Sequence, residues 1–88
     1  MRGSEDIELK NELKQMIIDA CDRDESIEEI GDDDGLFGDG TTLELDSMDA
    51  LQISMALNKK FGKKTTDSKK LRKIMTSINT LADYIQPE

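Results

Sequence analysis

The stretch LELDSMDALQISMALNKKFG, residues 43–62, decides the fold class because it holds a whole helix between a start signal and a stop signal. Asp46 and Asp49 have the spacing of a capping box, and Gly62 is a residue type that commonly ends helices. The stretch therefore predicts a helix over residues 47–61. Four apolar side chains are its predicted core anchors, and two more widen the apolar surface: Met48, Leu51, Met55 and Phe61, then Ile53 and Leu57.

Ser47 occupies the first turn of this predicted helix, directly after Asp46. The first turn has backbone N–H groups without helical partners and lies at the positive end of the helix dipole, so it favours an attached anion such as a phosphodiester. This placement makes Ser47 the main candidate functional residue. The same residues also allow a simpler interpretation, in which Asp46 or Ser47 only caps the helix.

Upstream of this stretch, the sequence predicts a helix followed by a long loop. Apolar residues at helical spacing predict the helix over residues 5–21, and glycines among acidic residues predict a loop over residues 22–46. The expected core face of the helix consists of Ile7, Leu9, Leu13, Met16, Ile17 and Ala20. The apolar residues expected to pin the loop are Ile27, Ile30, Leu36, Phe37, Leu43 and Leu45.

Downstream, the sequence predicts two shorter helices. One starts near Asp67 and carries Leu71 and Ile74, and the other starts at about Ser77 and stops before Pro87. The last helix is expected to bury Ile78, Leu81, Ala82 and Ile85. The predicted fold is therefore all-α: a four-helix bundle with a long first loop and a short third helix.

Composition limits the classes of function. The 88 residues predict a single domain over residues 1–88, with a small core because 35% of them are apolar. No apolar run is long enough to span a bilayer and no signal segment is present, so a cytoplasmic monomer that does not insert into membranes is expected. Cys21 has no partner for a disulfide, and a packed or half-exposed thiol is expected rather than a reactive one. The chain has no histidine, which excludes a Ser-His-Asp hydrolase.

Residues 43–62 resemble the acyl carrier protein family, in which an Asp-Ser-Leu or Asp-Ser-Met site precedes an amphipathic helix that ends in Phe-Gly. The matching residues are Asp46-Ser47-Met48-Asp49, Met55-Ala56-Leu57 and Phe61-Gly62, and Ala82-Asp83-Tyr84-Ile85 resembles the close of the family's last helix. The likeness covers roughly residues 5–85. It implies a four-helix bundle of the acyl-carrier type.

The resemblance also implies a function. Ser47 would carry 4'-phosphopantetheine, a flexible arm whose thiol holds acyl groups as thioesters and moves them between enzymes. The chain would then be no enzyme itself, but the substrate of a phosphopantetheinyl transferase. Its other partners would be acyl-loading, condensing and further acyl-processing enzymes of fatty acid, polyketide or related lipid biosynthesis. Flexible methionines on the helices could make room for an acyl chain between them: Met16, Met48, Met55 and Met75.

Two alternatives stay open. One is an aminoacyl, D-alanyl or peptidyl carrier, although the aspartate directly before Ser47 favours an acyl carrier because peptidyl carriers usually have a glycine-rich approach to their serine. The other is an unmodified acidic helical interaction module, in which Ser47 only caps a helix.

Charge is divided unevenly along the chain, which bears on its partners. Residues 1–49 contain 17 acidic and 4 basic side chains, whereas residues 50–88 contain 3 acidic and 8 basic ones, for a net charge of −8. Such asymmetry indicates electrostatic docking. Carriers of the family use an acidic surface on the second helix to meet basic patches on enzymes. The partner-binding residues that the resemblance implies are Asp46, Met48, Asp49 and Gln52.

The likeness to the family's docking helix is partial. Gln52 stands where the family often has Glu, and Asn58-Lys59-Lys60 replaces a stretch that is typically acidic. This pattern favours a dedicated set of enzymes over the central fatty acid synthase. Leu36-Phe37-Gly38 and Asp49-Ala50-Leu51 resemble segments of carriers from specialised lipid or polyene pathways.

Two further kinds of binding are disfavoured. The acidic segment Asp32-Asp33-Asp34-Gly35 lacks the order of acids, glycine and closing glutamate that an EF-hand requires, so no metal site is predicted. Nucleic acid is not an expected partner, because the chain is acidic and has only two phenylalanines and one tyrosine for stacking on bases.

Overall fold

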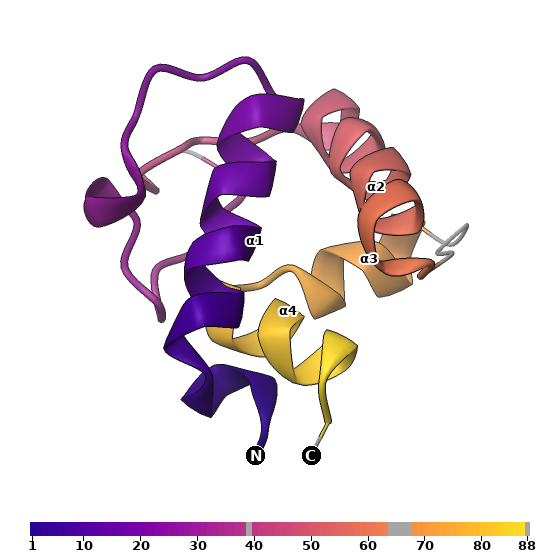
Figure 1. Ribbon diagram of the computed structural model, residues 1–88. Helices are drawn as coiled ribbons and strands as arrows, with labels where there is room; N and C mark the ends of the chain where they lie inside the picture. Colours follow the sequence, from indigo (N-terminus) through magenta and orange to yellow (C-terminus); the bar gives the residue numbers. More distant parts are fainter. Residues whose placement is uncertain (39, 64–67, 88) are drawn as a thin grey trace.

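Four helices form the body of the protein in the computed structural model, which describes residues 1–38, 40–63 and 68–87 (Figure 1). They are α1 (Ile7–Ala20), α2 (Ser47–Phe61), α3 (Ser68–Ile74) and α4 (Ile78–Ile85), with two single-turn 3₁₀ helices, η1 (Gly3–Glu5) and η2 (Ile27–Glu29). Among the described residues, β pairing is limited to one isolated bridge between Phe37 and Leu45. The predicted all-α four-helix bundle is confirmed, including its long first loop and its short third helix.

Local signals set most helix ends. Gly62 adopts a left-handed conformation with φ 69° directly after α2, so this helix has the predicted bounds. α1 begins at Ile7, two residues later than predicted, because the Asp6 side chain accepts a hydrogen bond from the Leu9 N–H at 3.1 Å and caps the helix. Ser77 caps α4 in the same way. The predicted start of the third helix near residue 67 lies outside the described residues.

The core lies where the four helices and the long loop meet. α1 packs against α2 and α4, and α3 packs against the same two helices. Four loop residues are buried among them, Ile30, Leu36, Leu43 and Leu45, while Ile27 and Phe37 pack against the core half-buried. The predicted pinning of the loop by these side chains is therefore confirmed. The loop runs along the side of α1 that is away from α2 before it reaches the start of α2 (Figure 1).

Three of the four predicted core anchors of α2 are wrong, whereas Phe61 packs against the core and the predicted Ile53 and Leu57 are buried. Met48, Leu51 and Met55 are 73%, 60% and 56% exposed, and Phe61 is half-buried. The helix buries its other apolar stripe instead, which consists of Ala50, Ile53 and Leu57. The two stripes have the same helical spacing, so periodicity alone could not choose between them. Ile7 was also predicted to be a core residue and is 70% exposed, because it lies in the first turn of α1 where no other helix covers it.

The two ends of the chain lie side by side at the end of the bundle opposite to the start of α2 (Figure 1). The Gly3 N–H donates to the Gln86 carbonyl at 2.7 Å, and the Ser4 N–H donates to Asp83 Oδ1 at 2.8 Å. A Cβ atom at Gly3 would overlap the carbonyl group of Ala82, so η1 can approach α4 this closely only with glycine at this position. These contacts join the first residues to the last helix.

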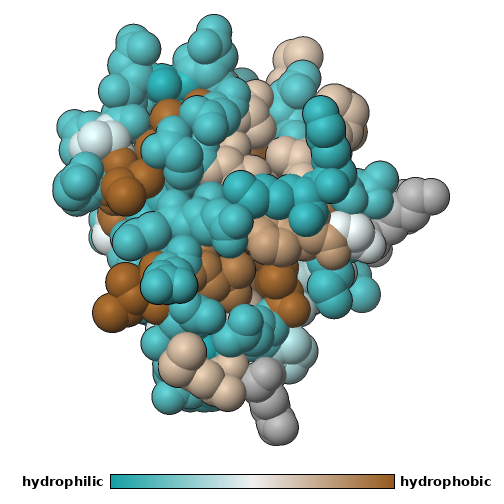
Figure 2. Space-filling view, viewed as in Figure 1, coloured by the Kyte–Doolittle hydropathy of each residue, from teal (hydrophilic) through white to brown (hydrophobic). Residues whose placement is uncertain are grey.

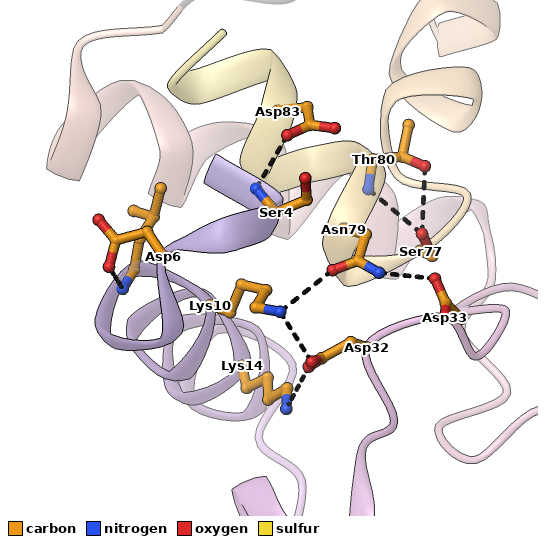
Figure 3. Close-up of polar contacts among 11 residues, drawn as sticks. Ser4, Asp6, Lys10, Lys14, Asp32, Asp33, Ser77, Asn79, Thr80 and Asp83 are labelled. Carbon is orange, nitrogen blue, oxygen red and sulfur yellow. Dashed lines mark hydrogen bonds and ion pairs between the residues drawn. The ribbon is translucent and has the colours of Figure 1, made fainter. Parts of the chain in front are cut away.

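A polar cluster around Asp32 fastens the long loop to α1 and α4 (Figure 3). The Lys10 ammonium donates to Asp32 Oδ2 at 2.8 Å, and the Lys14 ammonium lies 2.7 Å from Asp32 Oδ1. The second contact lacks hydrogen-bond geometry, so its attraction is ionic. From α4, the Asn79 backbone N–H donates to the Asp32 carbonyl at 3.0 Å, and the Asn79 side chain donates to Asp33 at 2.6 Å. The two lysine side chains are only 11% exposed, so water screens these ion pairs less than it does at an open surface.

We expect the change Asp32→Asn to lower the free energy of unfolding at neutral pH but not in strong acid. The hydrogen bond from Lys10 and the contact with Lys14 hold the pKa of Asp32 below its ordinary value. A carboxylate with a depressed folded-state pKa stabilises the fold above its unfolded pKa of about 3.9, and this contribution disappears as the pH falls through the folded value. Urea unfolding at about pH 7 and about pH 2 measures the difference. The exposed Glu28→Gln variant is the control, and a deficit of Asp32→Asn that persists in acid would contradict the ion-pair explanation.

Candidate functional site

Asp46 caps α2, and Ser47 does not. Asp46 Oδ1 accepts hydrogen bonds from the backbone N–H groups of Asp49 and Met48, both at 3.0 Å. Asp49 Oδ2 accepts one in return from the Asp46 N–H at 3.0 Å, which completes a capping box. The Asp49 and Met48 amides hold the pKa of Asp46 below its usual range, so the cap is ionised at neutral pH. The capping interpretation is therefore confirmed for Asp46 alone.

Ser47 is the first residue of α2, and its side chain is exposed. Its hydroxyl makes no hydrogen bond within residues 1–38, 40–63 and 68–87. The capping box thus binds the Met48 and Asp49 N–H groups without the Ser47 hydroxyl, which remains accessible to a second protein. The chain contains no histidine that could act as a base for this hydroxyl. The arrangement suits a serine that is modified by another protein.

An exposed apolar stripe starts directly after Ser47. We call it the outer face of α2, and it consists of Met48, Leu51 and Met55. These residues lie one and two helical turns apart, so their side chains share one side of the helix. Figure 2 shows weakly hydrophobic side chains, in pale brown, among hydrophilic ones over the region that α2 occupies in Figure 1. Apolar side chains grouped on an exposed face are typical of protein interaction surfaces.

Three of the four predicted partner-binding residues are exposed, and the fourth is half-buried. Asp46, Met48 and Gln52 are exposed beside or on the outer face of α2. Asp49 is half-buried and uses a carboxylate oxygen in the capping box. Sequence reasoning missed Leu51 and Met55 as accessible residues because it assigned them to the core. The signal that could have found them was the second apolar stripe at the same spacing, since a helix at a bundle surface needs only one such stripe for packing.

A small pocket adjoins Ser47 on the side of α3. This Ser47 pocket has a volume of about 150 Å³ and is lined by Ser47, Ala50, Lys69 and Arg72. The two basic residues stand three apart on α3, so both face the same way. Sequence reasoning gave Lys69 and Arg72 no role at the site, because nothing local in the sequence shows that α3 packs next to the start of α2.

The remaining candidate groups show no reactive chemistry. Burial, followed by the nearby Asp49, raises the pKa of the Cys21 thiol to about 11, so it is protonated at neutral pH. This agrees with the predicted packed, unreactive thiol, which is half-buried with its Sγ 3.9 Å from the Asp49 carbonyl oxygen. In the acidic loop, the Asp32 carboxylate forms ion pairs with Lys10 and Lys14. The described part of the chain holds no group of three or more Cys, Asp or Glu side chains placed to bind a metal ion.

A protein-family model for the phosphopantetheine attachment site matches residues 11–85. The chain belongs to this family. Members attach a 4'-phosphopantetheine group, so this phosphopantetheine-binding domain is a carrier rather than a catalyst. The recognition of an acyl-carrier-type domain from residues 43–62 is thereby confirmed. No curated protein and no solved structure gives a significant match to the chain.

The site of this phosphopantetheine-binding domain fits its prosthetic group. The arm is joined through a phosphodiester, which needs an accessible hydroxyl and a surrounding that tolerates negative charge. The exposed hydroxyl of Ser47, the first turn of α2 and the two cations of the Ser47 pocket together meet these needs. When attached, the group supplies a thiol that forms thioesters. None of the helices in the described residues has the length and apolar character needed to cross a membrane.

Proposed function

We propose that Ser47 is the attachment point of the 4'-phosphopantetheine arm and that the protein carries acyl groups as thioesters between enzymes. The observation that supports this most strongly is that Asp46 and Asp49, and not Ser47, cap the start of α2. Asp46 and Asp49 hold the capping box together, so the exposed Ser47 hydroxyl has no structural task there. A serine needed only for capping would have its oxygen on the backbone amides that Asp46 occupies.

The attachment step requires a second protein. The Ser47 oxygen forms a bond to the phosphorus nearest to the pantetheine of coenzyme A, the P–O bond of the pyrophosphate breaks, and adenosine bisphosphate leaves. The hydroxyl proton must pass to a base, and this chain has no histidine to accept it. A phosphopantetheinyl transferase would supply that base, so this protein is the substrate in the reaction and has no catalytic residue of its own.

Acyl groups are the cargo that the site favours. Asp46 precedes Ser47 directly, as in acyl carriers, and the approach to the serine has Leu43, Glu44 and Leu45 in place of glycines. Fatty acid, polyketide or related specialised lipid synthesis is the proposed setting, with acyl-loading and condensing enzymes as further partners. An aminoacyl or D-alanyl cargo is the second candidate, because the Asp-Ser-Met form also occurs in D-alanyl carriers.

The outer face of α2 is the proposed contact surface for these enzymes. It presents apolar side chains beside Ser47, with Asp46 and Gln52 exposed at its edge. Apolar anchors supply most of the affinity of an interface, while charges at the rim mainly steer encounter. An enzyme that docks on this face would place its own active site next to the first turn of α2.

We expect Leu51→Gln to reduce the kcat/KM of the transferase about fivefold, which is the effect of removing one moderate apolar contact. The melting temperature should stay unchanged, because the Leu51 side chain is 60% exposed. The matched control is Ile7→Gln, which changes an apolar residue that is 70% exposed at the start of α1. Equal rates for wild type and Leu51→Gln would show that this part of α2 lies outside the interface.

The test of the proposed function is the intact mass of the protein after incubation with coenzyme A and a promiscuous transferase. A gain of one phosphopantetheine supports the carrier function, and subsequent loading with different acyl and aminoacyl groups by their own ligases would distinguish the two kinds of cargo. No gain in mass by a folded sample would contradict the proposal. It would leave an unmodified acidic helical interaction module as the remaining function.

A further inference from the structure

The basic side of α3 lies next to Ser47, and the attachment and transfer steps of the proposed function do not require it. Its sequence, Ser68–Ile74, has four basic residues and no acidic one in a protein of net charge −8. Two of the four, Lys69 and Arg72, line the Ser47 pocket, whereas Lys70 and Lys73 do not. The positive charge of α3 is therefore directed partly at the residue that is proposed to carry a phosphodiester.

We propose that Lys69 and Arg72 bind the phosphodiester of the arm attached to Ser47 and hold it against α3. This inference rests on the proposed function, because it concerns the group that Ser47 would carry. A phosphodiester has one negative charge and oxygens that accept hydrogen bonds. The Arg72 guanidinium offers a planar fork of donors for such oxygens, and the Lys69 ammonium offers a compact charge.

The pocket has room for this contact because Ala50, the α2 residue that lines it beside Ser47, is small. Ala50 is buried and lines the pocket one turn after Ser47, and its small side chain leaves the space of about 150 Å³ open. α2 and α3 pack directly against each other, so their side chains approach across this gap. A phosphate joined to Ser47 would be confined to this region by its short covalent link, which keeps its effective concentration at the pocket high.

Arg72 is oriented before any phosphate arrives. Its guanidinium carbon lies 5.5 Å from the centre of the Phe37 ring. Phe37 is itself held by the isolated bridge to Leu45, with hydrogen bonds from the Leu45 N–H to the Leu36 carbonyl at 3.0 Å and from the Gly38 N–H to the Leu45 carbonyl at 3.2 Å. Leu45 directly precedes the cap residue Asp46. The same loop thus positions both the start of α2 and the arginine that faces it, which reduces the entropy that Arg72 loses on binding.

The carboxylates at this end of α2 are bound in the capping box. Asp46 and Asp49 direct oxygens to backbone amides in the capping box. The consequence for the arm is a preferred direction: its phosphate lies on the α3 side of Ser47, so the arm leaves the protein away from α1. The outer face of α2 then stays uncovered for a partner enzyme.

The experiment compares the melting temperatures of the apo and holo forms at low salt. We expect the wild-type holo form to melt about 4 °C above the apo form, as for two weak ion pairs in a domain of this size, and the difference to shrink in high salt. In Lys69→Gln/Arg72→Gln the rise should vanish or reverse, because the added charge then lacks the two cations of the Ser47 pocket in a protein of net charge −8. The matched control is Lys70→Gln/Lys73→Gln, which removes the same charge from the same helix and should keep the rise.

A second readout follows Arg72 directly. In ¹H–¹⁵N spectra, the Arg72 Nε–H resonance of the wild type should shift when Ser47 is modified, and the ³¹P resonance of the arm should differ between the wild type and the single Lys69→Gln variant. This measurement decides the question even if the double variant fails to fold. Equal melting temperatures of the wild-type apo and holo forms, together with an unmoved Arg72 resonance, would overturn the inference. A rise that survives in the Lys69→Gln/Arg72→Gln variant would do the same.

Intact mass separates this result from a failure of the proposed function. A sample that gains the arm but shows no rise in melting temperature and no resonance shift contradicts only the phosphate contact. A sample that never gains the arm contradicts the proposed function itself, and the phosphate contact with it.

Discussion

Replacing Ser47 with alanine is expected to abolish attachment of the phosphopantetheine arm completely while leaving the fold intact. The loss is complete because the reaction consumes the hydroxyl oxygen, for which alanine has no substitute. The free energy of unfolding should change by less than about 0.5 kcal/mol, as is usual for exposed positions. Asp46 and Asp49 keep the capping box of α2 without Ser47, and alanine is a good helix former. Intact mass after incubation with transferase and coenzyme A, together with urea unfolding, measures both effects.

The matched control is Ser54→Ala, which removes a serine from the middle of the same helix. It should be modified to the same extent as the wild type. Attachment to the Ser47→Ala variant would place the arm on another residue. A strongly destabilised Ser47→Ala variant would instead show that the hydroxyl has a structural role that the capping box does not reveal.

Replacing Leu57 with alanine is expected to destabilise the protein by about 2–5 kcal/mol, the range for a buried leucine that leaves a cavity. Leu57 is 0% exposed on the inner side of α2, whereas Leu51 is 60% exposed on the outer side. Leu51→Ala on the same helix should therefore cost less than about 0.5 kcal/mol. Small domains often have about 5 kcal/mol of stability in total, so Leu57→Ala should unfold at a much lower temperature or fail to fold.

Thermal and urea unfolding of this pair decides which stripe of α2 faces the core. A larger loss for Leu51→Ala than for Leu57→Ala would reverse the orientation of the helix and restore Met48, Leu51 and Met55 as its anchors. The pair is well matched, because both variants remove the same atoms from a leucine in the interior of one helix.

Sequence predicted the parts of the fold that depend on neighbouring residues. The bounds of α2 are correct because the Asp46–Asp49 capping box and Gly62 are local signals. The start of α1 was placed too early because Glu5, which suits a first helical turn, belongs to η1, and η1 packs against α4. A contact between the two ends of the chain cannot be predicted from the pattern of neighbouring residues.

Properties that depend on packing could not be predicted. The choice between two equally spaced apolar stripes on α2 follows from how α1 and α3 lie beside it. The meeting of Ser47 with Lys69 and Arg72 joins residues more than twenty positions apart, so charge counts showed only a basic segment. At the site, the sequence predicted the role of Ser47 and the cap at Asp46 because both can be recognised from a few adjacent residues.

The exposure of two methionines on α2 makes the proposed docking surface sensitive to oxidants. Met48 and Met55 are 73% and 56% exposed, whereas Met16 and Met75 are buried at 6% and 0%. Peroxide converts accessible thioethers into polar sulfoxides and spares those that water cannot reach. Mild oxidative damage would therefore make the outer face of α2 polar while the core stayed reduced and folded. A carrier in this condition would keep its melting temperature, yet Leu51 alone of the outer face of α2 would still offer its enzymes an apolar side chain.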